Sequence, residues 1–135
     1  MTSRLMRFTA AAWLLLWLDL SLGHVSAGFP HPAMWLPFLL LPVTAGVAWA
    51  AACRPSAWWT RLVRVTSYGA ILLGLLGFLF HLLRLVHDVK GAISWQVLVR
   101  LVRYPPLLAP LAITGVGLLG LLASHPAVEE RAAKP

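Results

Sequence analysis

The sequence predicts an all-α integral membrane protein: a bundle of four transmembrane helices with a short interfacial amphipathic helix between the third and the fourth. Of its 135 residues, 60% are hydrophobic and only 11% are charged, and the mean hydropathy is +0.81. A soluble domain of this length has too little interior to hide so much apolar surface. Long apolar stretches alternate with short basic or proline-rich connections, and we expect one transmembrane domain, residues 1–135.

The first predicted span covers about residues 8–27, directly after a short basic leader. An apolar helix of this length crosses the ~30 Å hydrocarbon core of a bilayer. The same pattern, with residues 25–27 as a small-residue cleavage site, also fits a signal peptide that is removed in the cell. Because Asp19 interrupts the apolar run, we expect a retained helix, and cleavage is kept as the alternative.

This first helix has two distinct faces. Trp13 and Trp17 lie on one of them, where they suit lipid or a partner protein. Residues at three- and four-residue steps share one side of a helix. On the other face such a set begins with small residues and later has a carboxylate: Thr9, Ala12, Leu16, Asp19, Gly23 and Ser26.

The second predicted span, about residues 33–53, follows a connection rich in glycine and proline. Pro37 and Pro42 both lie in its first half. Since proline has no N–H and clashes with the preceding turn, we expect a kink there and released backbone carbonyls. In the second half, Gly46 and Ala50 have the spacing of a small-residue helix contact.

The third predicted span, about residues 65–88, has one face unlike the rest: Ser67, Ala70, Gly74, Gly77, His81, Arg84 and Asp88. The first half of this face is small and the second half is ionisable. A charge in hydrocarbon costs several kcal/mol, so the face should point toward the protein. Small residues such as Gly74 and Gly77 usually indicate close helix packing, and less often a groove for a pigment, a quinone or a lipid tail.

The predicted interfacial helix, about residues 92–103, is too short and too charged to span. Its polar residues share one helical face and its apolar residues the other, which is typical of a helix lying on the membrane surface. Two prolines then begin the fourth predicted span, about residues 106–124. We expect the polar tail, residues 125–135, to be disordered.

Most of the basic residues, which give a net charge of +7, lie at the edges of apolar segments. That pattern orients a protein in a membrane and argues against nucleic-acid binding. One edge, residues 54–64, is a basic loop with Trp58 and Trp59 at headgroup level. Because the more basic side is normally cytoplasmic, we expect both termini in the cytoplasm, and a cell membrane of the bacterial inner-membrane type. The expected cytoplasmic residues are Arg4, Arg7, Arg54, Arg61, Arg64, Arg131 and Lys134.

This orientation gathers polar residues toward the outer ends of the first and third spans: Asp19, His24 and His31 from the first, and His81, Arg84, His87 and Asp88 from the third. A carboxylate inside a bilayer is protonated, paired or hydrated, and Arg84 is the expected partner of Asp19. One hypothesis is a structural ion pair that ties the two helices together, with the histidines as interfacial hydrogen-bonding groups. The other is that this intramembrane polar cluster of Asp19, Arg84 and Asp88 has a function.

A b-type haem is one cofactor that the cluster suggests. A haem in a bundle needs histidines at similar height on facing helices, and small residues where the porphyrin lies. His24 and His87 meet the first condition, whereas Gly74 and Gly77 suit a ring ligated through His81. His81, however, has only a carboxylate opposite it. A quinone or a pigment is the other cofactor that we consider.

A metal site is a further hypothesis, with His24, His31 and His87 as its ligands. Imidazole suits copper or zinc, but the spacings match no known metal motif. The single cysteine, Cys53, excludes an intrachain disulfide and a CxxC motif.

The sequence has no nucleophile with a base, no phosphate-binding loop and no pair of catalytic carboxylates, so we do not expect an enzyme. The leading hypothesis is a non-catalytic accessory or anchor subunit of a larger membrane complex, respiratory or photosynthetic electron transfer being the best fit. It depends on the near absence of soluble segments, on tryptophans within the spans (Trp13, Trp17, Trp49), and on a polar cluster open to one side. The alternative is a small haem b or quinone-binding electron carrier. A small proton or solute transporter built around Asp19 and Arg84 comes third.

Overall fold

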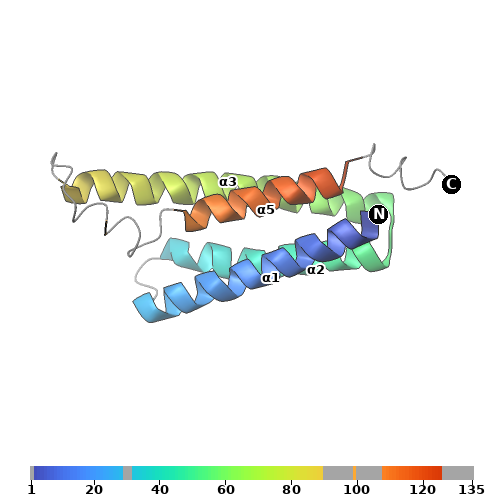
Figure 1. Ribbon diagram of the computed structural model, residues 1–135, viewed down its shortest axis with the longest axis horizontal. Coiled ribbons are helices and arrows are strands. Elements are labelled where there is room, and N and C mark those ends of the chain that lie inside the picture. The colour runs from blue at the N-terminus through green and yellow to red at the C-terminus, as the bar shows by residue number, and fades with distance from the viewer. Residues whose placement is uncertain (1, 29–31, 90–98, 100–107, 126–135) are drawn as a thin grey trace.

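The computed structural model describes residues 2–28, 32–89, 99 and 108–125. These residues form four α-helices and one short 3-10 helix, and no strand occurs among them: α1 (Thr2–Ala27), η1 (Pro32–Met34), α2 (Trp35–Cys53), α3 (Ala57–Val89) and α5 (Ala109–Ala123). Figure 1 shows the helices lying along one long axis. The predicted all-helical architecture is therefore confirmed. The predicted interfacial helix, residues 92–103, and nearly all of the predicted tail lie outside the described residues.

Three of the described helices are long and apolar enough to cross a membrane: α1 through Ser3–Gly23, α2 throughout, and α3 through Ala57–His87. The fourth described helix, α5, is apolar but has 15 residues. At 1.5 Å per residue it is about 22 Å long, shorter than the ~30 Å hydrocarbon core. The membrane character predicted from the sequence is thus supported by three spans.

The helices pack as two pairs. The most extensive contacts join α1 to α2 and α3 to α5, and the pairs then meet through α2 with α3 and α1 with α5. In Figure 1 the α3–α5 pair lies above the α1–α2 pair, and α3 continues beyond the start of α5. Among the described residues, four helices are therefore in contact over part of the bundle, and α3 extends past the start of α5.

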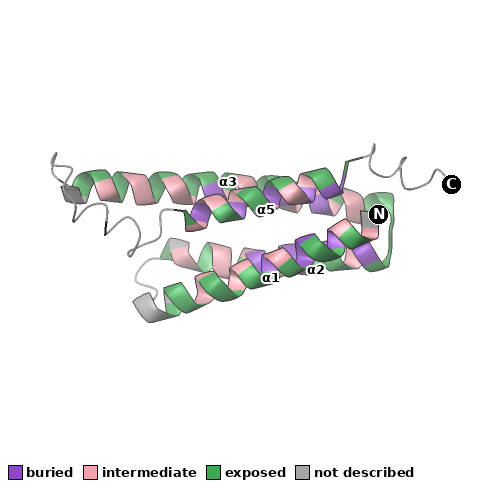
Figure 2. Cartoon of the chain, viewed as in Figure 1, coloured by how far each residue is buried: buried purple, intermediate pink, exposed green. Residues whose placement is uncertain are grey.

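The middle of the bundle is built around one large side chain. Trp13 is 1% exposed, and side chains from all the other helices complete its cluster: Leu41, Ala45, Ala70 and Ile113. Small alanines on α2 and α3 leave the space that the indole ring fills. The prediction that Trp13 and Trp17 face lipid or a partner protein is therefore wrong, because Trp17 also packs against this cluster. Figure 2 shows the buried residues following the inner surfaces of the helices.

Helices α3 and α5 are in close backbone contact along a line of glycines. A Cβ atom on Gly74 would collide with Thr114 Oγ1 and lie 2.8 Å from the Thr114 nitrogen. A Cβ on Gly117 would lie 3.0 Å from the Ser67 carbonyl oxygen, and one on Gly120 would collide with Ser67 Oγ. Only glycine allows this approach. The prediction that the small residues of this α3 face, such as Gly74, mark close helix packing is confirmed.

The prolines of α2 have different effects from each other. Pro37 is the third residue of the helix, where backbone N–H groups have no partner inside the helix, so it removes no hydrogen bond. Pro42 lies inside the helix and leaves the carbonyl four residues earlier without its usual donor. Gly46 makes no small-residue contact with the other described helices, because it is exposed and nothing lies within 4 Å of its Cβ direction.

Helix α3 begins eight residues before the predicted span, at Ala57. Ser56 starts it: its Oγ accepts a hydrogen bond from the Trp59 N–H at 3.3 Å, and its carbonyl accepts one from the Thr60 N–H at 3.0 Å. A serine side chain that binds an N–H in the first turn is a common helix start. The predicted basic loop is therefore only three residues long, and most of its arginines and both tryptophans lie on α3.

Candidate functional site

The outer-end polar cluster is only partly within the described side chains. His81 is half-buried on α3, whereas Asp19, Arg84 and His87 are exposed. The side chains of His24 and Asp88 and the whole of His31 lie outside the described residues. Within the described part, then, one of the predicted site residues faces the interior of the bundle and three face outward.

Asp19 and Arg84 do not form the predicted ion pair, since both side chains are described and exposed and no contact joins them. The cause on α1 is the burial of Trp17. Two residues further along a helix corresponds to a rotation of about 200°, so Asp19 points away from the interior when Trp17 points into it. On α3, the described part of α5 begins beside Gly77, since a Cβ added there would lie 3.2 Å from Pro110. Arg84 is seven residues further along α3, so the described part of α5 does not cover it.

Helix α5 packs against the glycines that were expected to accommodate a haem. Thr114 and Pro110 lie directly against Gly74, and Pro110 lies against Gly77. A porphyrin lying flat on Gly74 would have to displace this helix. The small residues of α3 therefore allow a neighbouring helix to pack closely. They do not support the hypothesis that His81 or His87 binds a haem.

No group of three or more histidine, cysteine, aspartate or glutamate side chains within reach of one metal ion occurs among the described residues. Two of the three predicted metal ligands, His24 and His31, have no described side chain. The third, His87, is exposed near the end of α3.

One polar contact inside the bundle was not expected from the sequence. Trp17 Nε1 donates a hydrogen bond of 2.9 Å to the Phe38 carbonyl oxygen. Phe38 is four residues before Pro42, so its carbonyl is the one that the proline leaves without a helical donor. The indole and the Phe38 ring also lie with their centroids 5.8 Å apart. In the sequence, Pro42 alone indicated that the Phe38 carbonyl has no donor within α2. The sequence did not indicate that a side chain of another helix supplies the donor.

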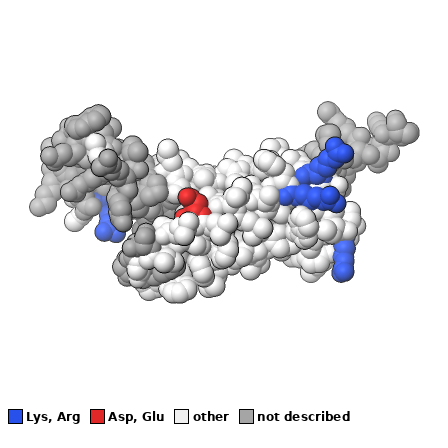
Figure 3. All heavy atoms as spheres, turned by 60° about the horizontal axis from the view of Figure 1, so that its bottom comes forward, with Lys and Arg blue, Asp and Glu red and all other residues white. Residues whose placement is uncertain are grey.

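The opposite end of the bundle is strongly basic. Figure 3 shows arginines gathered there, well separated from the single visible carboxylate. They come from the start of α1, the end of α2 and the start of α3: Arg4, Arg7, Arg54, Arg61 and Arg64. Asp19 is the only acidic residue whose side chain is described, and it lies twelve residues beyond Arg7, about 18 Å along the helix. The described side chains thus give this end no counter-charge.

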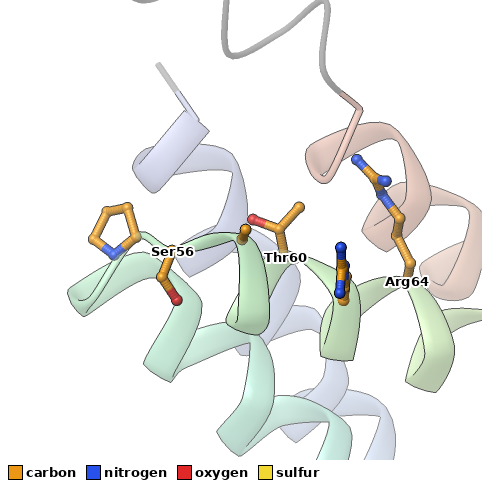
Figure 4. Close-up of a pocket in the computed structure, with 6 residues that line it drawn as sticks. Ser56, Thr60 and Arg64 are labelled. Atoms are coloured by element: carbon orange, nitrogen blue, oxygen red, sulfur yellow. The ribbon is translucent and has the colours of Figure 1, made fainter.

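Two of these arginines line a surface pocket of about 380 Å³ at the start of α3, together with Pro55, Ser56, Ala57 and Thr60. Figure 4 shows Ser56, Thr60 and Arg64 following one another along α3. Arg64 Nε and Nη2 both donate to the carbonyl oxygen of Ser124, the first at 3.1 Å. This arginine binds the last turn of α5, where carbonyl groups have no helical donor. Arg61 is exposed and makes no comparable contact with the other described residues.

No protein-family model, curated protein or solved structure matches this chain.

Proposed function

We propose that the protein is a non-catalytic accessory or anchor subunit of a larger membrane complex, and that α1 is the helix that meets the partner. The observation that carries the proposal is the exposed carboxylate of Asp19 on an apolar, membrane-spanning helix. Asp19 lies eight residues before the end of α1, about 12 Å along its axis.

An exposed carboxylate at this position is unfavourable in lipid. A charged side chain at the centre of a membrane helix costs about 2.5–3.5 kcal/mol on insertion scales. Asp19 lies four residues before the end of the span at Gly23, so its cost is a part of this value. The neighbouring exposed residues, Leu15, Leu18 and Leu22, are apolar and offer no hydrogen bond. A partner helix with an arginine, a lysine or a side-chain amide at the same depth would remove this cost.

The surface around Asp19 also suits a helix. Gly23, one turn further along α1, is exposed, and nothing lies within 4 Å of its Cβ direction. Small residues on a membrane helix allow a second backbone to approach closely, as Gly74 and Gly117 do inside this bundle. Asp19 and Gly23 together would form the polar and the small parts of one helix contact.

The proposal includes the arrangement expected from the sequence. In it, α5 is the central part of a fourth span, the basic end is cytoplasmic, and both termini are on that side of the cell membrane. The basic end supports this orientation, because arginines concentrate on the cytoplasmic side of membrane proteins. We also propose, from the sequence alone, that the complex carries out electron transfer.

The test is to purify the tagged full-length chain from its own membranes in mild detergent and to measure the mass of the assembly. We expect an assembly larger than the monomer, from which Asp19→Ala and Asp19→Asn release the monomer with unchanged helix content. Leu22→Ala, three residues along the same exposed face, is the matched control and should leave the assembly intact. An assembly that is unaffected by loss of Asp19, or a wild-type chain that is monomeric, would contradict the proposal.

Two further results would replace the proposal rather than adjust it. If Asp19 serves a cation of its own chain, Asp19→Arg will lower the amount of folded monomer, and adding Arg84→Asp will restore it. If the protein is an electron carrier, a reduced-minus-oxidised spectrum of the purified chain will show a b-type signal that His81→Ala or His87→Ala abolishes. We expect neither, and a chain without a Soret band.

A further inference from the structure

We infer that the pocket at the start of α3 binds the phosphate headgroup of an anionic phospholipid. This site is independent of the proposed partner contact at Asp19, which lies toward the other end of α1. The inference combines three observations: a pocket of sufficient size, an arginine at its rim without a carboxylate partner, and tryptophans at the same level of the bundle.

The pocket has the size and the polar groups that a headgroup needs. Its volume of about 380 Å³ is within the ~300–1,000 Å³ that small-molecule sites occupy. Ser56 and Thr60 bring hydroxyl groups to its wall, and Arg61 and Arg64 bring guanidinium groups. Guanidinium groups bind phosphate oxygens with short, charge-assisted hydrogen bonds, often two at once.

The two arginines have different roles in this pocket. Arg64 already donates two hydrogen bonds to the Ser124 carbonyl, so its guanidinium is held in place at one wall. Arg61 is exposed and pairs with none of the described carboxylates. An anion entering the pocket would therefore meet one fixed and one adaptable positive charge. Arg61 is the residue whose removal should weaken binding without disturbing the helix contacts.

The position of the pocket favours a lipid over a free anion. Trp58 is exposed and Trp59 half-buried in the first turn of α3, directly beside the lining residues. Tryptophan is enriched at the level of lipid headgroups. Between Val65 and Leu83 the exposed residues of α3 carry no charge and are mainly apolar, with Leu72, Leu76 and Leu79 among them. A lipid could thus place its phosphate in the pocket and its acyl chains along α3.

The experiment measures lipid binding to the full-length chain in detergent micelles, with short-chain phosphatidylglycerol as the probe and phosphatidylcholine of the same acyl length for comparison. We expect the wild-type protein to prefer phosphatidylglycerol, and Arg61→Gln to lower that affinity about tenfold, as loss of a charge-assisted contact would. Arg61→Lys should retain most of the affinity. Arg7→Gln is the matched control: it removes the same charge at the same end, outside the pocket, and should change the affinity less than about twofold.

Several outcomes would overturn the inference. Equal losses in Arg61→Gln and Arg7→Gln would show a diffuse charge effect instead of a site. Equal binding of the two lipids would show that the headgroup charge is not recognised. Displacement of phosphatidylglycerol by millimolar inorganic phosphate would show a site for a free anion. Dependence on Arg61 that appears only with Glu129→Gln and Glu130→Gln would show that these two glutamates of the same chain compete with the lipid for the pocket.

Discussion

The indole N–H of Trp17 takes the place of the N–H that Pro42 lacks. Its hydrogen bond to the Phe38 carbonyl is 2.9 Å long and partly buried, and it joins α1 to α2, two helices that are apolar and long enough to span a membrane. An unsatisfied carbonyl inside a membrane costs several kcal/mol. The proline that weakens α2 therefore also creates the acceptor that binds α1.

Trp17→Phe should destabilise the bundle by about 1 kcal/mol, the usual net value of one hydrogen bond, while keeping an aromatic ring beside Phe38. In a Pro42→Ala background the backbone N–H of residue 42 satisfies the same carbonyl. There we expect Trp17→Phe to cost clearly less. The measurement is the free energy of unfolding of the four proteins in mixed micelles, followed by circular dichroism. Equal costs in the two backgrounds would show that the proline and the indole act separately.

Gly74→Ala should destabilise the protein by about 1–3 kcal/mol, the usual cost of overpacking. An added methyl would collide with Thr114 and approach the backbone of α5, and a helix backbone cannot move aside as a flexible side chain can. The control is Gly69→Ala on the same helix, which is exposed and has nothing within 4 Å. We expect Gly69→Ala to be neutral or slightly stabilising, because alanine favours helix over glycine. Thermal unfolding in detergent compares the two, and equal midpoints would contradict the close α3–α5 contact.

Cys53 offers a direct test of the proposed orientation. It is exposed at the end of α2, beside the basic residues that we place in the cytoplasm. A maleimide that cannot cross membranes should label it in inverted vesicles and leave it unlabelled in intact cells. The matched control, Cys53→Ser with Pro32→Cys, puts the thiol at the opposite end of α2, where Pro32 is exposed, and should reverse the result. Labelling of wild-type Cys53 in intact cells would contradict the orientation.

That Gly74 and Gly77 lie at a close helix contact was predictable from the sequence because it depends on local spacing, whereas the identity of the neighbouring helix, α5, was not. Glycines at three- and four-residue steps share a face whatever surrounds the helix, and a small face in a membrane protein usually meets another helix. The extent of α3 was less predictable. Tryptophans and arginines at residues 54–64 are equally suited to a headgroup-level loop and to a helix start, and the Ser56 cap decided between them.

The candidate site was less predictable than the fold. The sequence placed Asp19 opposite Arg84 because both lie on polar faces of apolar helices. The structure turns Asp19 outward, because Trp17 and Asp19 are about 200° apart on α1 and the indole has both a cavity and an acceptor inside the bundle. Which face of an amphipathic helix is buried depends on the space and the hydrogen-bond partners that its neighbours offer, and these neighbours come from distant parts of the chain.

By itself, then, the sequence determined the all-helical membrane character of this protein and its line of closely packed glycines. Both depend on properties of single segments: apolar length against bilayer thickness, and residue size against helical spacing. Only the tertiary structure decided that Trp13 is buried and Trp17 half-buried, that Asp19 is exposed, and that Arg64 binds the end of α5. Each of these depends on contacts between helices, since the rotation of a helix about its axis is set by the surfaces that pack against it.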